Sequence, residues 1–217
     1  MKAALIEGIY GILPTNLDTP ILLKHAESAL KGGVRTLQYR EKKLGYKRSL
    51  QRALALRELT SRFGARLIIN DSMQLAHESH ADGVHLGKDD IVDMAHMRQQ
   101  ARNNGALDDD FIIGVTCRAD AVFAKLALDH GASYVALGAV FGSKTKPEVP
   151  VLGLPRLQKS RQMFPDAVIC AIGGINVENI ASVKIMGASS AALISGLFDT
   201  PDIEQRAQAL IEIWEQS

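Results

Sequence analysis

Short apolar runs alternate with longer, helix-patterned segments along the whole chain. The runs are four to seven residues long, aliphatic or β-branched, and bounded by Gly, Asn or Asp, which predicts strands. These predicted strands cover residues 8–13, 34–40, 66–70, 83–86, 111–115, 134–138, 168–172 and 190–194. Between them, apolar residues recur at i, i+3 and i+4, the spacing of a half-buried helix. The predicted helices cover 19–31, 46–63, 73–79, 91–103, 119–130, 154–163, 177–186 and 203–215.

Strict alternation of apolar strands and helices predicts a parallel sheet that is covered by helices. Such a sheet either closes into a barrel or stays open, and the count of eight units favours the (β/α)8 TIM barrel. At 217 residues the chain is short for that fold, so we expect short loops and a single domain over 1–217. An open flavodoxin-like sheet is the alternative, but it would build its site from two loops instead of many strand ends.

Composition excludes several classes of partner and compartment. Lys and Arg total 25 against 24 Asp and Glu, so no charge excess indicates nucleic acid or a membrane surface as a partner. Cys117 and Cys170 are isolated and lack the spacing of a disulfide framework or a zinc site. No apolar run reaches the roughly 20 residues of a membrane span, and the N-terminus carries no secretory pattern. We therefore expect a soluble, cytoplasmic protein.

In a barrel of this kind, functional groups come from the carboxyl ends of the strands. After the second predicted strand, alternation points Gln38, Arg40 and Lys42 to the same side. A guanidinium and an ammonium group so placed suit a diphosphate. The alternative is an exposed turn in which Glu41 pairs locally with these cations.

Carboxylates follow the next two strands. The run Leu67-Ile68-Ile69 stops at Asn70-Asp71, and the following strand leads into Asp89-Asp90. Magnesium prefers one or two carboxylates together with phosphate oxygens, so Asp71 with Asp90 or Asp89 could hold a diphosphate-bound ion. Helix capping is the ordinary alternative for an Asp at the start of a helix.

The later strand ends carry groups that suit a phosphate. Ser143-Lys144-Thr145-Lys146 offers two hydroxyls and two ammonium groups, although solvated turns can look the same. Gly173-Gly174 follows the seventh strand and Ser195-Gly196 the eighth, where barrels often bind phosphate on backbone N–H groups. Tight turning alone also explains such glycines. Thr116 and Cys117 are not diagnostic, and the histidines, His85 included, show no ligand spacing and are interpreted as structural or surface residues.

The order of these motifs resembles the thiamine phosphate synthase family, from Gly11 to about Asp202. The family's motifs are represented here by Gln38-Tyr39-Arg40-Glu41-Lys42, Asn70-Asp71, residues 83–90, residues 114–118, residues 143–146, residues 172–175 and Ile194-Ser195. Thr116 stands where Ser is usual, Ser143 where Thr is usual, Ala139 where Pro is common, and Arg118 where His is frequent. A single motif of this kind is weak, but seven in order are specific.

The resemblance implies a TIM-barrel transferase of thiamine biosynthesis. It would couple 4-amino-2-methyl-5-(diphosphooxymethyl)pyrimidine with hydroxyethylthiazole phosphate, or its carboxylated form, and yield thiamine phosphate and diphosphate. One Mg²⁺ on Asp71 and Asp90 is implied as cofactor, and the family motif selects Asp90 over Asp89. The pyrimidine diphosphate would be bound by Gln38, Tyr39, Arg40, Glu41, Lys42, Asn70, Thr116 and Lys146. The thiazole phosphate would be bound by Ser143, Lys144, Thr145, Gly174, Ile194 and Ser195.

Within that set, Arg40, Lys42, Thr116 and Lys146 are the implied catalytic residues, since the chemistry asks for stabilisation of a leaving diphosphate and not for a nucleophile. Two other functions remain open. A thiazole tautomerase of the same fold would not need the diphosphate and magnesium residues, and a non-catalytic barrel could bind thiamine phosphates as a regulator. A homo-oligomer is also left open.

Overall fold

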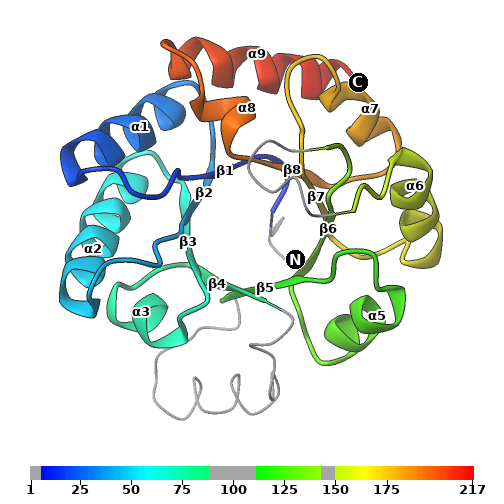
Figure 1. Ribbon diagram of the computed structural model, residues 1–217, viewed down its shortest axis with the longest axis horizontal. Coiled ribbons are helices and arrows are strands. Elements are labelled where there is room, and N and C mark those ends of the chain that lie inside the picture. Colours follow the sequence, from blue (N-terminus) through cyan, green and yellow to red (C-terminus); the bar gives the residue numbers. More distant parts are fainter. Residues whose placement is uncertain (1–5, 88–110, 143–149) are drawn as a thin grey trace.

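The eight strands of the barrel lie side by side in sequence order and close on themselves (Figure 1). The computed structural model describes residues 6–87, 111–142 and 150–217. Every neighbouring pair is parallel, and β1 closes the ring by pairing Tyr10 with Ala192 of β8. The strands are β1 (Gly8–Ile12), β2 (Thr36–Tyr39), β3 (Arg66–Asn70), β4 (Gly83–Leu86), β5 (Ile112–Thr116), β6 (Tyr134–Gly138), β7 (Ile169–Ile172) and β8 (Ser190–Leu193). The prediction of a closed barrel is confirmed.

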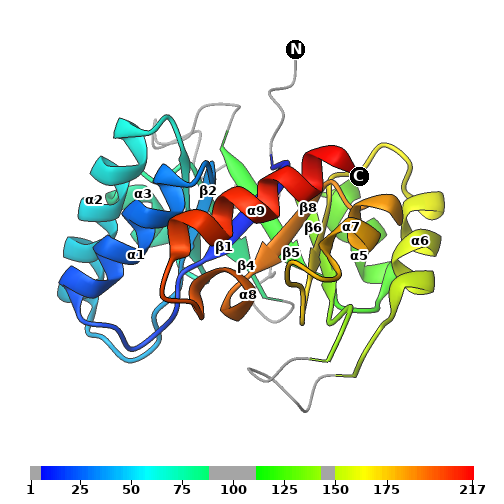
Figure 2. The same ribbon diagram turned by 90° about the horizontal axis from the view of Figure 1, so that it is seen from above.

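Helices form the outer layer, as Figures 1 and 2 show. The described helices are α1 (Thr19–Lys31), α2 (Tyr46–Arg62), α3 (Met73–Glu78), α5 (Ala121–Asp129), α6 (Leu154–Met163), α7 (Ile180–Ile185), α8 (Ser195–Phe198) and α9 (Ile203–Gln216). The helix predicted over 91–103 lies outside the described residues. In the part of the chain that the structure describes, no helix is both long and apolar enough to cross a membrane.

Alternation along each strand divides the apolar residues into two clusters. Outward side chains such as Leu37, Ile69 and Val84 pack under the helices and form the larger cluster. Inward side chains fill the barrel itself, and Ile6 joins them from the segment before β1. This inner cluster consists of Ile6, Tyr10, Ile12, Ile68, Ile112, Tyr134, Ala136, Cys170 and Ala192. The interior of the barrel is therefore a packed apolar core.

Two helices begin later than their apolar patterns predict. Arg118 has a positive φ of 51°, and Asp120 caps α5 by accepting the Phe123 N–H at 3.0 Å, so α5 begins at Ala121 instead of residue 119. Before α7, the Asn179 side chain accepts the Asn176 N–H at 2.9 Å, and the resulting turn delays the helix to Ile180. The short α8 was not predicted, because four residues are too few to show helical periodicity.

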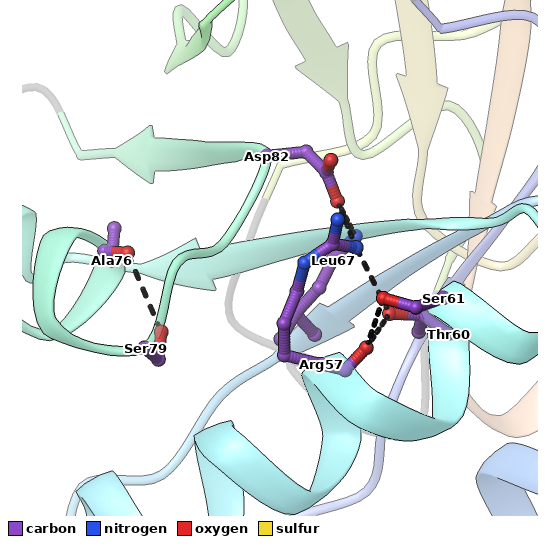
Figure 3. A network of polar contacts seen from close by, with 7 residues as sticks. All are labelled: Arg57, Thr60, Ser61, Leu67, Ala76, Ser79 and Asp82. Atoms are coloured by element: carbon purple, nitrogen blue, oxygen red, sulfur yellow. Dashed lines mark hydrogen bonds and ion pairs between the residues drawn. The ribbon is translucent and has the colours of Figure 1, made fainter. Parts of the chain in front are cut away.

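At the amino-terminal end of the barrel, one carboxylate joins α2 to the sheet (Figure 3). Asp82, just before β4, accepts hydrogen bonds from Arg57 of α2 at 2.9 Å and from the Leu67 N–H of β3 at 2.7 Å. Arg57 also donates to the Thr60 hydroxyl at 3.4 Å. This network ties three elements together at the opposite end from the strand termini that carry the candidate motifs.

Candidate active site

A cavity of about 470 Å³ opens at the carboxyl ends of the strands. That volume is in the range of small-molecule sites. On the side of β2 to β5 its polar lining consists of Gln38, Arg40, Lys42, Asn70, Asp71, His85, Thr116 and Arg118. On the side of β6 to β8 the lining is mostly backbone and small or aliphatic residues. The two halves of the cavity therefore differ in chemistry.

Charged groups lie at the rim of the polar half. The Lys42 ammonium group is 3.4 Å from the Asp71 carboxylate, and both side chains keep contact with solvent. Arg40 and Arg118 also line the cavity, so three cations face one described carboxylate. Arg40, Arg118 and Asn70 line the cavity together. The rim is suited to an anion with several oxygens.

Asp71 is held in an unusual backbone conformation. Its φ is 63°, and its N–H donates to the His85 carbonyl of β4 at 2.8 Å. This left-handed turn directly follows β3, and the carboxylate remains about a third exposed at the rim. Asp71 does not cap α3, because Ser72 does so by accepting the Leu75 N–H at 3.1 Å. The capping explanation that the sequence left open for Asp71 is thereby removed.

Behind the rim, five inward side chains form a hydrogen-bonded row, here called the polar row. It consists of Gln38, Tyr10, Tyr134, His85 and Thr116, from β2, β1, β6, β4 and β5. The Gln38 amide Nε2 donates to the Tyr10 hydroxyl at 2.8 Å, and that hydroxyl lies 3.1 Å from the Tyr134 hydroxyl. His85 lies 2.7 Å from the Tyr134 hydroxyl through Nδ1 and 2.7 Å from the Thr116 hydroxyl through Nε2.

Burial keeps the interior of the polar row uncharged. It lowers the pKa of His85 to about 4 and raises the pKa values of Tyr10 and Tyr134 far above neutrality. Sequence reasoning missed Tyr10 and Tyr134 and treated His85 as structural. The available signal was position: each lies at an inward-facing register position of its strand, where a polar side chain in an apolar barrel needs a partner.

The half of the cavity next to β6, β7 and β8 is lined largely by backbone groups. Gly173 and Gly174 have positive φ values of 105° and 63°, and a Cβ at Gly174 would lie 2.4 Å from the Gly142 carbonyl oxygen. The Asn179 side chain fixes this turn by donating to the Gly174 carbonyl at 3.0 Å. Ile194 and Ser195 line the same half of the cavity, at the start of α8. The structure thus brings the predicted Gly174, Ile194 and Ser195 together.

Two predicted binding residues do not line the cavity. Tyr39 points outward and is buried in the outer apolar cluster. The Glu41 carboxylate accepts the N–H groups of Lys42 and Lys43 at 2.8 and 3.0 Å and lies 3.7 Å from Arg52 of α2. Burial raises the pKa of Glu41, but these N–H donors and the Arg52 charge outweigh burial and lower it overall. Local pairing of Glu41 is therefore observed, with Arg52 as the cationic partner.

The remaining predicted residues are Asp90, Ser143, Lys144, Thr145 and Lys146, and they lie outside the described residues. Within the described ranges, no three His, Cys, Asp or Glu side chains come together as a metal site. Asp71 is the described member of the predicted magnesium pair.

Comparison with known proteins identifies the family. The model of the thiamine monophosphate synthase family matches residues 9–197. A thiamine-phosphate synthase of Methylobacillus flagellatus is 41% identical over 209 residues, 96% of each chain, and one of Chromobacterium violaceum is 42% identical over 205 residues, 94% of this chain and 95% of the other. A solved thiamine phosphate pyrophosphorylase from Pyrococcus furiosus superposes with a TM-score of 0.84 at 27% identity, covering 99% of this chain and 98% of that one.

These matches span nearly the whole chain, and they agree with the order of strand-end motifs. The resemblance inferred from the motifs is confirmed, and the chain belongs to the thiamine monophosphate synthase family.

Proposed function

We propose that this chain is a transferase that makes thiamine phosphate. It joins 4-amino-2-methyl-5-(diphosphooxymethyl)pyrimidine to hydroxyethylthiazole phosphate and releases diphosphate; with the carboxylated form of the thiazole phosphate, carbon dioxide is released as well. The observation that carries this proposal is that Gln38, Arg40, Lys42, Asn70, Asp71 and Thr116, the motif residues of three separate strand ends, meet in one cavity. A cationic rim beside a deeper uncharged region suits a substrate with a diphosphate on one side and a neutral ring on the other.

The reaction is a displacement at the methylene carbon of the pyrimidine substrate. The C–O bond to diphosphate breaks with its electron pair leaving on oxygen, and the thiazole nitrogen then forms the new C–N bond. The electron-rich aminopyrimidine stabilises the developing cation, so the protein must stabilise the leaving anion and hold the two rings in line. Arg40 and Lys42 are placed at the rim for the first task, and we assign Lys146 to it as well.

We propose magnesium as the cofactor, one ion per active site, with Asp71 and Asp90 as its protein ligands. The position of Asp71 supports this assignment: its carboxylate lies at the rim, next to cations that suit diphosphate oxygens. Few carboxylates together with substrate phosphate oxygens are what magnesium prefers. When bound, the ion would neutralise charge on the departing diphosphate. Lys42, now 3.4 Å from Asp71, would then be free to bind the diphosphate itself.

Gln38, Asn70 and Thr116 are assigned to the pyrimidine substrate. The thiazole phosphate is assigned to the other half of the cavity, with Gly174, Ile194 and Ser195 there and Ser143, Lys144 and Thr145 completing the set. The absence of a Cβ at Gly174 lets this turn pack against the Gly142 backbone, and the place of the turn after β7 agrees with the usual phosphate position of such barrels. Tyr39 and Glu41 are not assigned substrate contacts, because their side chains are directed elsewhere.

We further propose that the enzyme works in the cytoplasm on small molecules, without a nucleic-acid partner. The near balance of 25 cationic and 24 anionic residues supports this. A homo-oligomer stays open.

One assay tests the proposal. Purified protein is incubated with both substrates and Mg²⁺, and thiamine phosphate and diphosphate are measured over time. We expect equal amounts of the two products. If neither product forms while a known synthase makes both under the same conditions, the proposal is wrong. Tight binding of thiamine phosphate without turnover would then indicate the regulator, and isomerisation of the thiazole phosphate the tautomerase.

A further inference from the structure

The polar row carries an inference about how the pyrimidine substrate is held, and that inference rests on the proposed function. Each member has a limited number of protons, so the hydrogen bonds of the row cannot be assigned independently. A primary amide nitrogen can only donate, and a neutral imidazole has one donor and one acceptor nitrogen. The direction of each bond therefore constrains the direction of the next.

Gln38 sets the direction at one end. Its Nε2 faces the Tyr10 hydroxyl at 2.8 Å, so the Tyr10 oxygen accepts and the Tyr10 proton must go elsewhere. The Tyr134 hydroxyl is 3.1 Å away and accepts it. Tyr134 then donates to Nδ1 of His85 at 2.7 Å, and the His85 proton is on Nε2, which donates to Thr116 at 2.7 Å. The Thr116 hydroxyl proton is left to point into the cavity.

The reverse direction leaves a proton unused. If His85 carried its proton on Nδ1, Tyr134 would accept it and donate to Tyr10, whose oxygen would then receive two donors. The Tyr10 proton would have no acceptor among the described residues, and a buried, unpaired hydroxyl costs about 1–3 kcal/mol. Two protons on His85 would place a cation among neutral hydroxyls in the barrel interior, which is more costly still. The first direction leaves no proton of Tyr10, Tyr134 or His85 without an acceptor.

The packing around the row holds the rings in place. The Tyr134 ring passes over Gly114 of β5, where a Cβ would lie 2.0 Å from the ring, so the glycine is needed for the ring to reach His85. The His85 and Tyr134 rings are stacked with centroids 5.6 Å apart, and Tyr10 meets Tyr134 edge-on at 6.1 Å. Tyr10 and Tyr134 are 1% and 0% exposed. The rings are too closely packed to change partners easily.

We propose that Tyr10, Tyr134 and His85 are positioning residues that orient the two ends of the polar row toward the pyrimidine substrate. One end presents the Thr116 hydroxyl as a hydrogen-bond donor. The other presents the Gln38 amide oxygen as an acceptor, because the amide nitrogen is already engaged with Tyr10. An aminopyrimidine carries both an exocyclic N–H donor and ring-nitrogen acceptors. The Thr116 hydroxyl can therefore donate to a ring nitrogen, and the Gln38 amide oxygen can accept from the amino group.

The first test determines the direction of the hydrogen bonds in the polar row and needs no catalytic turnover. Protein with ¹⁵N-labelled histidine is examined by NMR, and the His85 signals are assigned by comparison with His85→Gln. We expect His85 to be the neutral form with its proton on Nε2. A proton on Nδ1 would overturn the proposal. Because this readout needs no substrate, it remains valid even if the protein makes no thiamine phosphate, so failure of the proposed function is separately visible.

The second test is a double-mutant cycle. Tyr134→Phe breaks the row and Thr116→Val removes its end. We expect each to lower kcat/KM for the pyrimidine diphosphate about tenfold, the equivalent of one hydrogen bond, with KM for the thiazole phosphate unchanged. The double variant should lose much less than the product of the two single losses, since Tyr134 acts in part through Thr116. Losses that multiply to about a hundredfold would contradict the proposal.

Three variants serve as controls for simple misfolding. Tyr46→Phe removes a phenolic hydroxyl from the exposed start of α2, outside the cavity, and should leave the kinetics unchanged. His85→Gln keeps an acceptor for Tyr134 and a donor for Thr116, so it should retain kcat/KM within about threefold, whereas His85→Leu keeps neither and should lose about tenfold. Equal losses in these two variants would show that His85 only fills space.

Discussion

At the scale of single residues, Asp71 combines a left-handed backbone with a rim carboxylate. With φ at 63°, few residue types fit the position, but Asn tolerates this conformation as Asp does. Asp71→Asn therefore removes the charge and keeps the turn. We expect turnover at limiting magnesium to fall at least about 100-fold, which corresponds to about 2.7 kcal/mol of transition-state stabilisation. Initial rates across a magnesium titration measure this.

The same variant should unfold at nearly the wild-type temperature, because the Asp71 side chain is about a third exposed and its ion pair with Lys42 lies in contact with solvent. Thermal unfolding without magnesium supplies that control. An unchanged initial rate at limiting magnesium would remove Asp71 from the metal site.

His85 gives the protein a pH-dependent stability. Burial lowers its pKa from 6.5 to about 4, so the unfolded chain binds a proton in this range that the folded protein does not. Stability should therefore decrease as the pH falls from about 6.5 to about 4, by up to about 1.4 kcal/mol per pH unit from this residue. His25, whose pKa is also lowered by burial, acts in the same direction.

Urea unfolding at several pH values, without magnesium, measures the slope. His85→Gln should have a shallower slope than wild type, by up to about 1.4 kcal/mol per pH unit, because one fewer proton is taken up on unfolding. Identical slopes in wild type and His85→Gln would mean that His85 is already protonated in the folded state.

At the scale of elements, α2, β3 and β4 depend on one carboxylate at the end of the barrel away from the cavity (Figure 3). Asp82→Ala leaves the Leu67 N–H and the Arg57 guanidinium without their acceptor. We expect the free energy of unfolding to fall by about 1–3 kcal/mol, the cost of unpaired, partly buried donors. Chemical denaturation measures it, and kcat at a permissive temperature should not change. A reduced kcat in a fully folded variant would contradict this separation of stability from function.

The elements themselves were largely predictable from sequence, for a definable reason. Runs such as Leu67-Ile68-Ile69 are apolar on both faces, because one face fills the barrel and the other lies under helices, and that pattern is distinctive. The exceptions have local causes. The late starts of α5 and α7 come from side-chain turns at Asp120 and Asn179, and α8 is too short to be periodic.

At the scale of the whole molecule, the site was predictable in part. Arg40, Lys42, Asn70 and Asp71 immediately follow strands, so the barrel rule alone places them at one rim. The polar row was not predictable, since its bonds join residues far apart in the chain: Tyr10 and Tyr134 are 124 positions apart and His85 and Tyr134 are 49 apart. Such pairs depend on how eight strands close into a ring, which no local pattern contains. The same limit explains Tyr39 and Glu41, which share a motif with cavity residues yet face the other way.

The charge distribution of the whole molecule predicts a salt effect on catalysis. The chain is nearly neutral overall, at +1, but Arg40, Lys42 and Arg118 gather at the cavity rim. An anionic substrate is therefore drawn to the rim by local charge, and this attraction weakens with ionic strength. We expect kcat/KM for the pyrimidine diphosphate to decrease steadily from low salt to about 0.3 M, with kcat nearly constant.

Arg118→Asn tests where that salt effect originates. Asn accepts the positive φ of 51° at this position, so the variant removes one charge and keeps the turn before α5. Its kcat/KM should be lower than wild type at low salt and should approach the wild-type value as salt increases, because screening removes the same attraction that the substitution removes. A constant ratio between the two proteins at all salt concentrations would instead mean that Arg118 contacts the bound substrate directly.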